Sequence, residues 1–275
     1  MEKSINYERW LEVQQYRKTS VKRLLGIAEK AENYWTKEGL KRNELGFKNF
    51  LKYCCNQGYS KDYIYQIQWA VQTYCNYLKQ VKGQKIKLFL IKQEAKEQSR
   101  IALNASALKK VKVWLEQEQA DYWLNQLLWS LFYGSGLRRK EALNIGLKDI
   151  DLRHKVLYIN SLKTGKSRVL PLSNSQVLAI VNYQKEERPI AKLGYESKLI
   201  LGRRGGNAQS LLGMQLLKWQ EGTGLESKLC WHVLRHTIAT NLVERGLKIE
   251  LLSRFLGHEN VASTGRYLHH LKENT

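Results

Sequence analysis

The sequence lacks the features that would place the protein in a membrane or outside the cell. No stretch approaches the ~20 uninterrupted apolar residues that a transmembrane helix requires, and the first ten residues, MEKSINYERW, lack the apolar core of a secretory signal. None of the four cysteines forms a CxxC pair, which indicates reduced packing residues and not a metal or redox site. We therefore expect a folded cytoplasmic protein.

Acidic residues are scarce relative to basic ones. The 46 Lys and Arg residues outnumber the 25 Asp and Glu residues, so the formal net charge is +21. Residues 1–98 hold 19 basic and 10 acidic residues (+9), and residues 99–275 hold 27 and 15 (+12). Lysines are interleaved with Tyr and Trp in the first half. This pattern favours nucleic acid over an anionic membrane as the partner of both halves.

Two helical regions joined by a lysine-rich segment indicate two domains. Apolar and aromatic residues recur at spacings of three and four over about residues 19–80. NQGYS (residues 56–60) supplies a glycine that ends one helix and a serine that caps the next. Residues 79–99 are rich in lysine and poor in core periodicity, so we predict the connection there, with domains over 1–98 and 99–275.

The second half is predicted to be mainly helical. One helical pattern runs from Ala107 to the glycines of YGSG (residues 133–136), and a new helix begins within LRRKEALNI (residues 137–145). Residues 202–207, GRRGGN, are predicted to form a loop. Further helices are predicted at residues 175–187, 211–219, 232–245 and 249–256.

One small antiparallel sheet is predicted within this half. KVLYIN (residues 155–160) and SRVLPL (residues 167–172) are short β-type runs, and they flank SLKTGK (residues 161–166). Gly165 suits the turn of a hairpin.

Two arginines could neutralise a DNA phosphate. The two negatively charged non-bridging oxygens of a phosphodiester pair bidentately with guanidinium groups, and Arg138 and Arg235 are candidates for this role. His258, just after Gly257, could donate a hydrogen bond as charge builds up on the phosphate. Each residue alone is more typical of a structural role. Their occurrence in one order with a lysine, a second histidine and a tyrosine favours catalysis.

The nucleophile and the proton-transfer groups are also present. Tyr267 could form a covalent bond to phosphorus, which conserves the bond energy and lets a later hydroxyl reverse the break. His232 is the candidate base that takes the phenol proton, and it shares a helix face with Arg235 three residues later. Lys163 is the candidate acid that protonates the leaving 5′ oxygen. Lys166 in the same hairpin is its rival.

Four segments closely resemble the tyrosine recombinases, the superfamily of phage integrases and Xer proteins. They are GLRRKEAL, the hairpin LKTGKSRVLPL, HVLRHTIATNLVERG and LGHENVASTGRYLHH. The resemblance covers about residues 105–270, and it is looser over 19–80. It implies a mainly α fold with a small antiparallel β-sheet in a catalytic integrase-type domain over 99–275. Residues 1–98 would be a helical core DNA-binding (SAM-like) domain plus linker.

The resemblance also implies the roles of particular residues. The active-site positions would be Arg138, Lys163, His232, Arg235, His258 and Tyr267. Glu141 occupies the acidic position that supports the first arginine, and Tyr267 would form a 3′-phosphotyrosyl bond. Only eight residues follow Tyr267, and no arm-binding domain is seen at the start. A short-site, Xer-like or transposon-type enzyme is therefore expected.

The implied activity is site-specific recombination of double-stranded DNA, without metal or other cofactor, for integration and excision of a mobile element. Implied partners are the recombination sites, a homo-tetramer assembled on two of them, and accessory DNA-bending or directionality proteins, all at the nucleoid in the cytoplasm. DNA inversion, dimer resolution and a non-catalytic architectural or regulatory role stay open. A metal-dependent nuclease is disfavoured, because no HExxH motif or clustered carboxylate accompanies the histidines.

Overall fold

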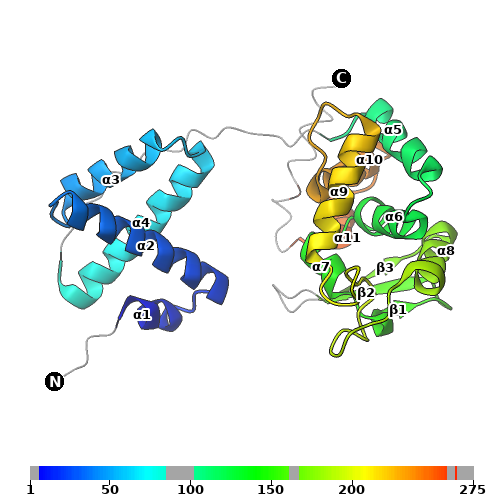
Figure 1. Cartoon of the computed structure of the whole chain (residues 1–275), viewed down its shortest axis with the longest axis horizontal. Coiled ribbons are helices and arrows are strands. Elements are labelled where there is room, and N and C mark those ends of the chain that lie inside the picture. The colour runs from blue at the N-terminus through cyan, green and yellow to red at the C-terminus, as the bar shows by residue number, and fades with distance from the viewer. Residues whose placement is uncertain (1–5, 85–101, 161–166, 259–263, 265–275) are drawn as a thin grey trace. The chain divides into compact units, whose positions relative to one another are not determined.

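The computed structural model describes residues 6–84, 102–160, 167–258 and 264. The chain divides into two compact units, Met1–Glu97 and Gln98–Thr275 (Figure 1). Each unit has its own cluster of buried hydrophobic side chains. Each therefore has the core that independent folding requires.

The described part of the first unit is helical. Its helices are α1 (Tyr7–Val13), α2 (Lys18–Lys37), α3 (Glu44–Asn56) and α4 (Lys61–Lys82). Helix α2 packs against α1, α3 and α4. Gly58 has a φ of +72°, and the Ser60 side chain accepts a hydrogen bond from the Tyr63 amide. The predicted glycine stop and serine cap between α3 and α4 are thus confirmed.

The first unit differs from its prediction at both ends. Helix α1 lies before residue 19, where the predicted helical region begins, and it buries Tyr7, Trp10 and Leu11. Helix α4 extends to Lys82 and ends at Gly83, which has a φ of +67°. The lysine-rich connection therefore begins later than residue 79, because the last turn of α4 is itself rich in lysine.

Two cysteines lie in the core of the first unit. Cys54 of α3 and Cys75 of α4 are buried and carry free thiols. Burial raises the pKa of the Cys54 thiol to about 11 and that of Cys75 to about 12. Both thiols are therefore protonated at neutral pH, as packing residues are.

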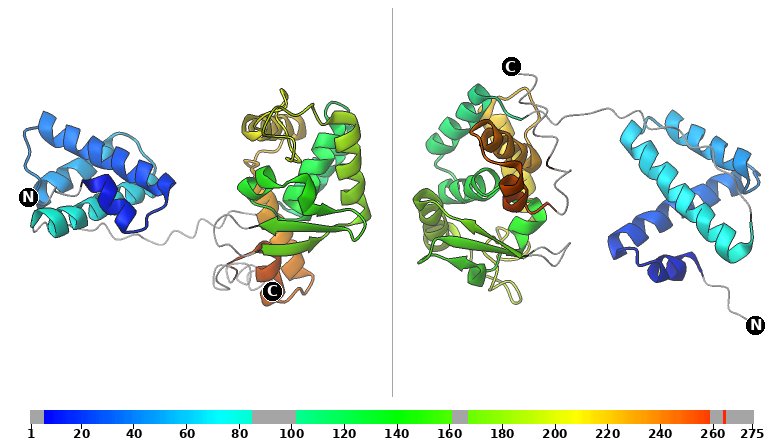
Figure 2. Two further views of the ribbon diagram at one scale, coloured as in Figure 1. Left: turned by 90° about the horizontal axis from the view of Figure 1, so that it is seen from below. Right: turned by 180° about the vertical axis from the view of Figure 1, so that it is seen from behind.

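The second unit combines helices with a three-stranded antiparallel sheet (Figure 2). The sheet has the order β1-β2-β3, and the chain follows that order. The strands are β1 (Ile150–Asp151), β2 (Val156–Asn160) and β3 (Ser167–Pro171). The α-helices are α5 (Ala105–Gln117), α6 (Tyr122–Trp129), α7 (Arg139–Asn144), α8 (Asn174–Asn182), α9 (Gln209–Thr223), α10 (Trp231–Glu244) and α11 (Ile249–Leu256). Short π- and 3₁₀-helical segments are η1 (Ser130–Gly134), η2 (Leu147–Asp149) and η3 (Tyr183–Glu187).

The predicted antiparallel pairing of the two β-type runs is confirmed, and a third strand extends the sheet. The turn predicted at Gly165 lies outside the described residues. Strands β2 and β3 pair with Leu157 opposite Leu170 and Ile159 opposite Arg168. Leu157, Ile159 and Leu170 are buried, so this face of the hairpin packs on the core. Strand β1 has only two residues, too few for an alternating pattern to show in the sequence.

The helix predicted to run unbroken from Ala107 is instead two helices, α5 and α6, with a break over residues 118–121. Asp121 takes a φ of +60°. The Glu187 carboxylate accepts hydrogen bonds from the first amides of α6, those of Trp123 and Leu124, both at 2.8 Å. A cap supplied from more than 60 residues away leaves no local signal in the sequence.

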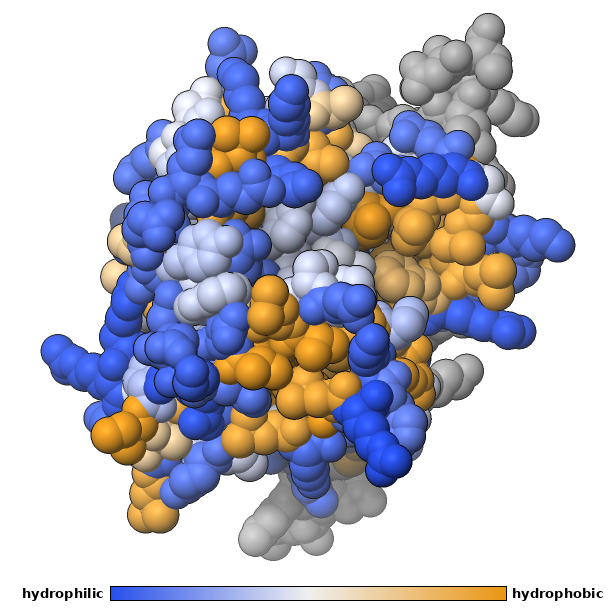
Figure 3. Space-filling model, turned by 90° about the vertical axis from the view of Figure 1, so that its right-hand side faces the viewer, coloured by the Kyte–Doolittle hydropathy of each residue, from blue (hydrophilic) through white to orange (hydrophobic). Residues whose placement is uncertain are grey.

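No helix among the described residues is both long enough and apolar enough to cross a membrane. Exposed large hydrophobic side chains are nevertheless present, including Leu178 and Val181 of α8. On the face drawn in Figure 3, hydrophobic residues lie in separate patches among hydrophilic ones. The apolar surface on that face is therefore divided and not a continuous band.

Candidate active site

Arg138 is fixed at the start of α7 by Glu141. The Glu141 carboxylate accepts a hydrogen bond from the backbone amide of Arg138 at 2.8 Å and another from its Nη1 at 2.8 Å. A carboxylate three residues into a helix that reaches back to the preceding amide satisfies a donor the helix cannot. The Arg138 side chain is 40% exposed and that of Glu141 is 9% exposed. The guanidinium is thus held in place and still accessible.

Arg235 lies on α10, and its side chain is almost completely buried. Its Nη1 donates to the Gly136 carbonyl at 2.6 Å, and its Nη2 donates to the Leu256 carbonyl at 2.7 Å. Its Nη1 also lies 3.8 Å from Oε2 of Glu141. Because a buried charge is costly unless paired and hydrogen-bonded, these contacts show what holds the second predicted arginine in the core.

The two arginines converge on the end of α11. Arg138 Nη1 lies 3.5 Å from the Leu256 carbonyl, which Arg235 also binds, and Arg138 Nη2 donates to the Gly257 carbonyl at 3.3 Å. The structure therefore brings Arg138, Glu141 and Arg235 together from the start of α7 and from α10.

A third arginine of this cluster, Arg168 on β3, was not predicted. Its Nη1 and Nη2 donate to Oε1 and Oε2 of Glu141, each at 3.0 Å, which is a bidentate pair. The one signal in the sequence is an arginine at an inward-facing position, in alternation with Leu170. Three guanidinium groups around one carboxylate leave two formal positive charges, which suits an anionic ligand.

Glu141 is ionised at any physiological pH. Burial opposes its ionisation, but the Arg168 guanidinium, and after it the backbone amide and guanidinium of Arg138, lower the pKa of Glu141 from 4.5 to about 2. A depressed pKa in the folded state contributes stability above the unfolded pKa. This contribution is therefore complete above about pH 4.5 and is lost as the pH falls toward 2.

His258 follows the turn that ends α11. Gly257 has a φ of +64° and ends the helix, and the His258 amide donates to the Ser253 carbonyl at 3.0 Å. The His258 Nδ1 lies 2.7 Å from the hydroxyl oxygen of the buried Thr264. This hydrogen bond orients the imidazole one residue beyond the carbonyls that hold the two predicted arginines.

Of the remaining predicted site residues, the structure describes only His232. His232 is exposed in the first turn of α10, one turn before Arg235. Lys163, its rival Lys166 and Tyr267 lie outside the described residues. Their roles stay predictions.

A different histidine on α10 is part of the core. His236 is buried, and its Nδ1 lies 3.3 Å from the Thr240 hydroxyl oxygen. Among the described residues, no three His, Cys, Asp or Glu side chains are grouped as metal ligands would be. The described polar groups that gather are instead the three arginines and Glu141.

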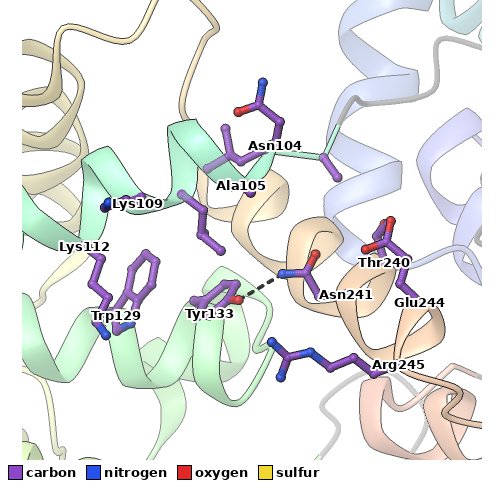
Figure 4. A pocket seen from close by; sticks show the side chains of 13 residues that line it. Asn104, Ala105, Lys109, Lys112, Trp129, Tyr133, Thr240, Asn241, Glu244 and Arg245 are labelled. Carbon is purple, nitrogen blue, oxygen red and sulfur yellow. Dashed lines mark hydrogen bonds between the residues drawn. The ribbon is translucent and has the colours of Figure 1, made fainter.

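A cavity of about 840 Å³ lies elsewhere in the second unit (Figure 4). Lys109 and Trp129 are among its lining residues, and across it the Asn241 amide donates to the Tyr133 hydroxyl at 3.0 Å. None of the candidate catalytic residues that the structure describes lines it. The arginine cluster is therefore a separate site.

Comparison with known proteins places the second unit in a family. Residues 103–274 match the model of the phage integrase family. The chain is 33% identical over 147 residues to the tyrosine recombinase XerD of Corynebacterium glutamicum, covering 53% of this chain and 48% of the relative. It is 30% identical over 148 residues to the tyrosine recombinase XerA of Pyrococcus horikoshii, covering 54% and 51%. The chain thus spans about half the length of these curated relatives.

Among solved structures, the fold resembles that of the Tn1549 transposon integrase in complex with transposon right end DNA. The TM-score is 0.72 at 16% sequence identity, and the match covers 95% of this chain and 92% of the other. At this identity the likeness concerns the fold, and it extends over both units. The match over residues 103–274 is longer than half of the sequence, and the chain therefore belongs to the phage integrase family.

Proposed function

We propose that the protein is a site-specific DNA recombinase that cleaves and rejoins DNA strands through a 3′-phosphotyrosyl intermediate. The observation that carries the proposal is the convergence of Arg138 and Arg235 on Glu141 and the Leu256 carbonyl, two residues before His258. Paired guanidinium groups at a fixed spacing match the non-bridging oxygens of a phosphodiester. Membership of the phage integrase family supports the same reading.

In the proposed reaction the phenol oxygen of Tyr267 attacks phosphorus, and the bond from phosphorus to the 5′ oxygen breaks. His232 receives the phenol proton, and Lys163 gives a proton to the departing 5′ oxygen. Arg138, Arg235 and His258 stabilise the charge that gathers on the non-bridging oxygens. The reverse reaction with a 5′ hydroxyl from another duplex rejoins the strands, so no external energy source is needed.

We further infer that the substrate is a pair of double-stranded recombination sites and that four copies of the chain act on them, with accessory DNA-bending or directionality proteins as further partners. The role proposed is integration and excision of a mobile element. The structural likeness to a transposon integrase supports this choice at the level of the fold. The genes beside this one test it: neighbouring mobilisation genes would support it, whereas inverted repeats flanking a promoter would indicate an invertase.

Cleavage is expected to proceed without a divalent metal, because the arginine cluster supplies the positive charge. A nicked substrate that releases a short fragment bearing the new 5′ hydroxyl on cleavage would trap the covalent intermediate. We expect the protein–DNA adduct to form at the same rate with excess EDTA as with Mg²⁺, measured on a denaturing gel. Adduct formation that stops in EDTA and returns with Mg²⁺, or cleavage that leaves only free ends, would favour a nuclease.

We also propose that the first unit binds DNA, through the surface where α2 and α4 pack together. Arg23 of α2 donates to Gln66 of α4 at 3.0 Å and lies 5.6 Å from the ring centre of Trp69, which is 42% exposed. Lys30 lies 4.5 Å from the ring centre of Tyr59. The Arg23 guanidinium against the exposed Trp69 ring suits contact with phosphates and sugars. The partly buried Lys30 beside Tyr59 adds a second cation–aromatic pair in α2 and the segment before α4.

Binding by both units predicts the salt dependence of affinity. Each phosphate contact adds roughly 0.9 to the slope of log affinity against log salt concentration on duplex DNA. A fragment of residues 100–275, which contains the second core, should bind more weakly and with a shallower slope than the full chain. Titration of labelled duplex at several NaCl concentrations measures this. Equal slopes would show that the first unit does not contact the DNA backbone.

A further inference from the structure

Arg168 occupies an unusual place for a charged residue. It faces Ile159 in the β2–β3 register and points the same way as Leu157 and Leu170, which are buried. Its own side chain is only 11% exposed. An arginine at an inward-facing sheet position is expected only where a partner compensates its charge. What it contacts should therefore explain why it is there.

The compensating partner is Glu141. The end of the Arg168 guanidinium binds both carboxylate oxygens at 3.0 Å, and the same oxygens bind the backbone amide and Nη1 of Arg138 at 2.8 Å. Glu141 thus binds the largely buried Arg168 and the more exposed Arg138, and the third arginine, Arg235, lies 3.8 Å away. Among the described residues, the buried Arg168 Nε has no hydrogen-bond partner, so the two Nη groups make the contacts to Glu141.

The Arg168 guanidinium also lies against the turn that ends α11. A Cβ built on Gly257 would lie 2.5 Å from Arg168 Nη1, so glycine at this position leaves room for the arginine. The carbonyl of Gly257 accepts the hydrogen bond from Arg138 Nη2, and His258 follows it. Arg168 therefore touches both structures that hold Arg138 in place, the Glu141 carboxylate and the Gly257 turn.

We propose that Arg168 is a positioning residue: by clamping Glu141 from the buried side, it fixes the orientation in which Arg138 meets the scissile phosphate. This inference rests on the proposed recombinase function. Both Nη groups of Arg168 bind the Glu141 carboxylate, so its role is assigned to the carboxylate and not to the phosphate. Without it, the Glu141 carboxylate would keep its contacts to Arg138 but lose the two bonds that set its plane.

The first test is the rate of cleavage within the bound complex. Small errors in the placement of a reacting or stabilising group cost up to about 100-fold, so Arg168→Ala should slow formation of the covalent adduct by about 10- to 100-fold. The measurement is single-turnover, with the nicked substrate saturated by protein and well below the unfolding temperature of each variant. As a matched control, Arg153→Ala removes an arginine from the exposed turn between β1 and β2. It should cleave within about twofold of the parent.

A double substitution tests whether Arg168 acts through Glu141. If it does, the losses caused by Arg168→Ala and Glu141→Gln will not multiply, and the double variant will cleave within about threefold of the slower single variant. A substrate with sulfur at the bridging 5′ position separates Arg168 from the hairpin lysine. Sulfur leaves without a proton, so it should not restore the rate of an Arg168 variant.

Three results would overturn the proposal: a folded Arg168→Ala variant with the parent rate, losses that multiply with Glu141→Gln, or rescue by bridging sulfur. If Arg168→Ala does not fold, Arg168→Lys takes its place. A lysine keeps the charge but cannot form the bidentate pair. Adduct formation by Arg168→Lys should therefore be at least about fivefold slower than in the parent, and an unchanged rate would overturn the proposal. A parent protein that forms no adduct would refute the recombinase function itself, which is a separate outcome.

Discussion

Tyr267→Phe is expected to abolish strand cleavage while DNA affinity stays nearly unchanged. The substitution deletes the one oxygen that would attack phosphorus and removes no positive charge, so the electrostatic part of binding is retained. Covalent adduct on the nicked substrate should fall below detection, and the dissociation constant from a gel-shift titration should stay within about twofold, since one uncharged hydroxyl contributes little to binding that charged groups dominate.

A matched control removes a different phenol. Tyr158 of β2 is 44% exposed and belongs to the same unit, so Tyr158→Phe should leave adduct formation unchanged. If the Tyr267→Phe protein still forms a protein–DNA adduct, another residue is the nucleophile, and the proposed intermediate is wrong. The predicted role of Tyr267 is central to the mechanism, because it alone explains how the bond energy is conserved.

Lys163→Ala is expected to slow cleavage of ordinary DNA severely and to be rescued by a better leaving group. An alkoxide leaves poorly unless it is protonated, and general-acid help contributes about 10²–10⁴-fold to the rate. Sulfur in place of the bridging 5′ oxygen needs no such proton. The variant should therefore cleave the sulfur-containing substrate at close to the parent rate, measured by single-turnover adduct formation.

The arginines provide the contrast. Arg138→Ala and Arg235→Ala should stay slow on the sulfur substrate, because the non-bridging oxygens that they neutralise are unchanged. Arg138 is the cleaner of the two, since Arg235 also holds the Gly136 and Leu256 carbonyls in the core. Rescue of Lys166→Ala without rescue of Lys163→Ala would show that the other lysine of the hairpin is the acid.

Helices and strands whose ends depend on neighbouring residues could be predicted from the sequence. Helix α11 ends where Gly257 takes a positive φ, and its predicted bounds, 249–256, are those observed. Strands β2 and β3 lie within their predicted runs because both are short segments of β-type residues. The structure also confirms the predicted mainly helical fold with a small antiparallel sheet.

Features that depend on distant contacts could not be predicted. The break between α5 and α6 is stabilised by Glu187, and no residue near position 118 in the sequence indicates this contact. Strand β1 owes its existence to pairing with β2. In the first case a residue more than 60 positions away decides the outcome. In the second, a strand of two residues is too short to produce a periodic pattern.

The sequence by itself determined which chemical groups are available and which family the chain resembles. Arg138, Glu141, Arg235 and His258 stand in motifs whose residue types are specific enough to recognise without coordinates. Only the tertiary structure decided that Arg168 joins them. A sequence shows an arginine in a strand, but whether its guanidinium meets solvent or a buried carboxylate depends on the packing of β3 against α7 and the end of α11. The difference matters because a guanidinium buried away from water needs a counter-charge, and Glu141 supplies it.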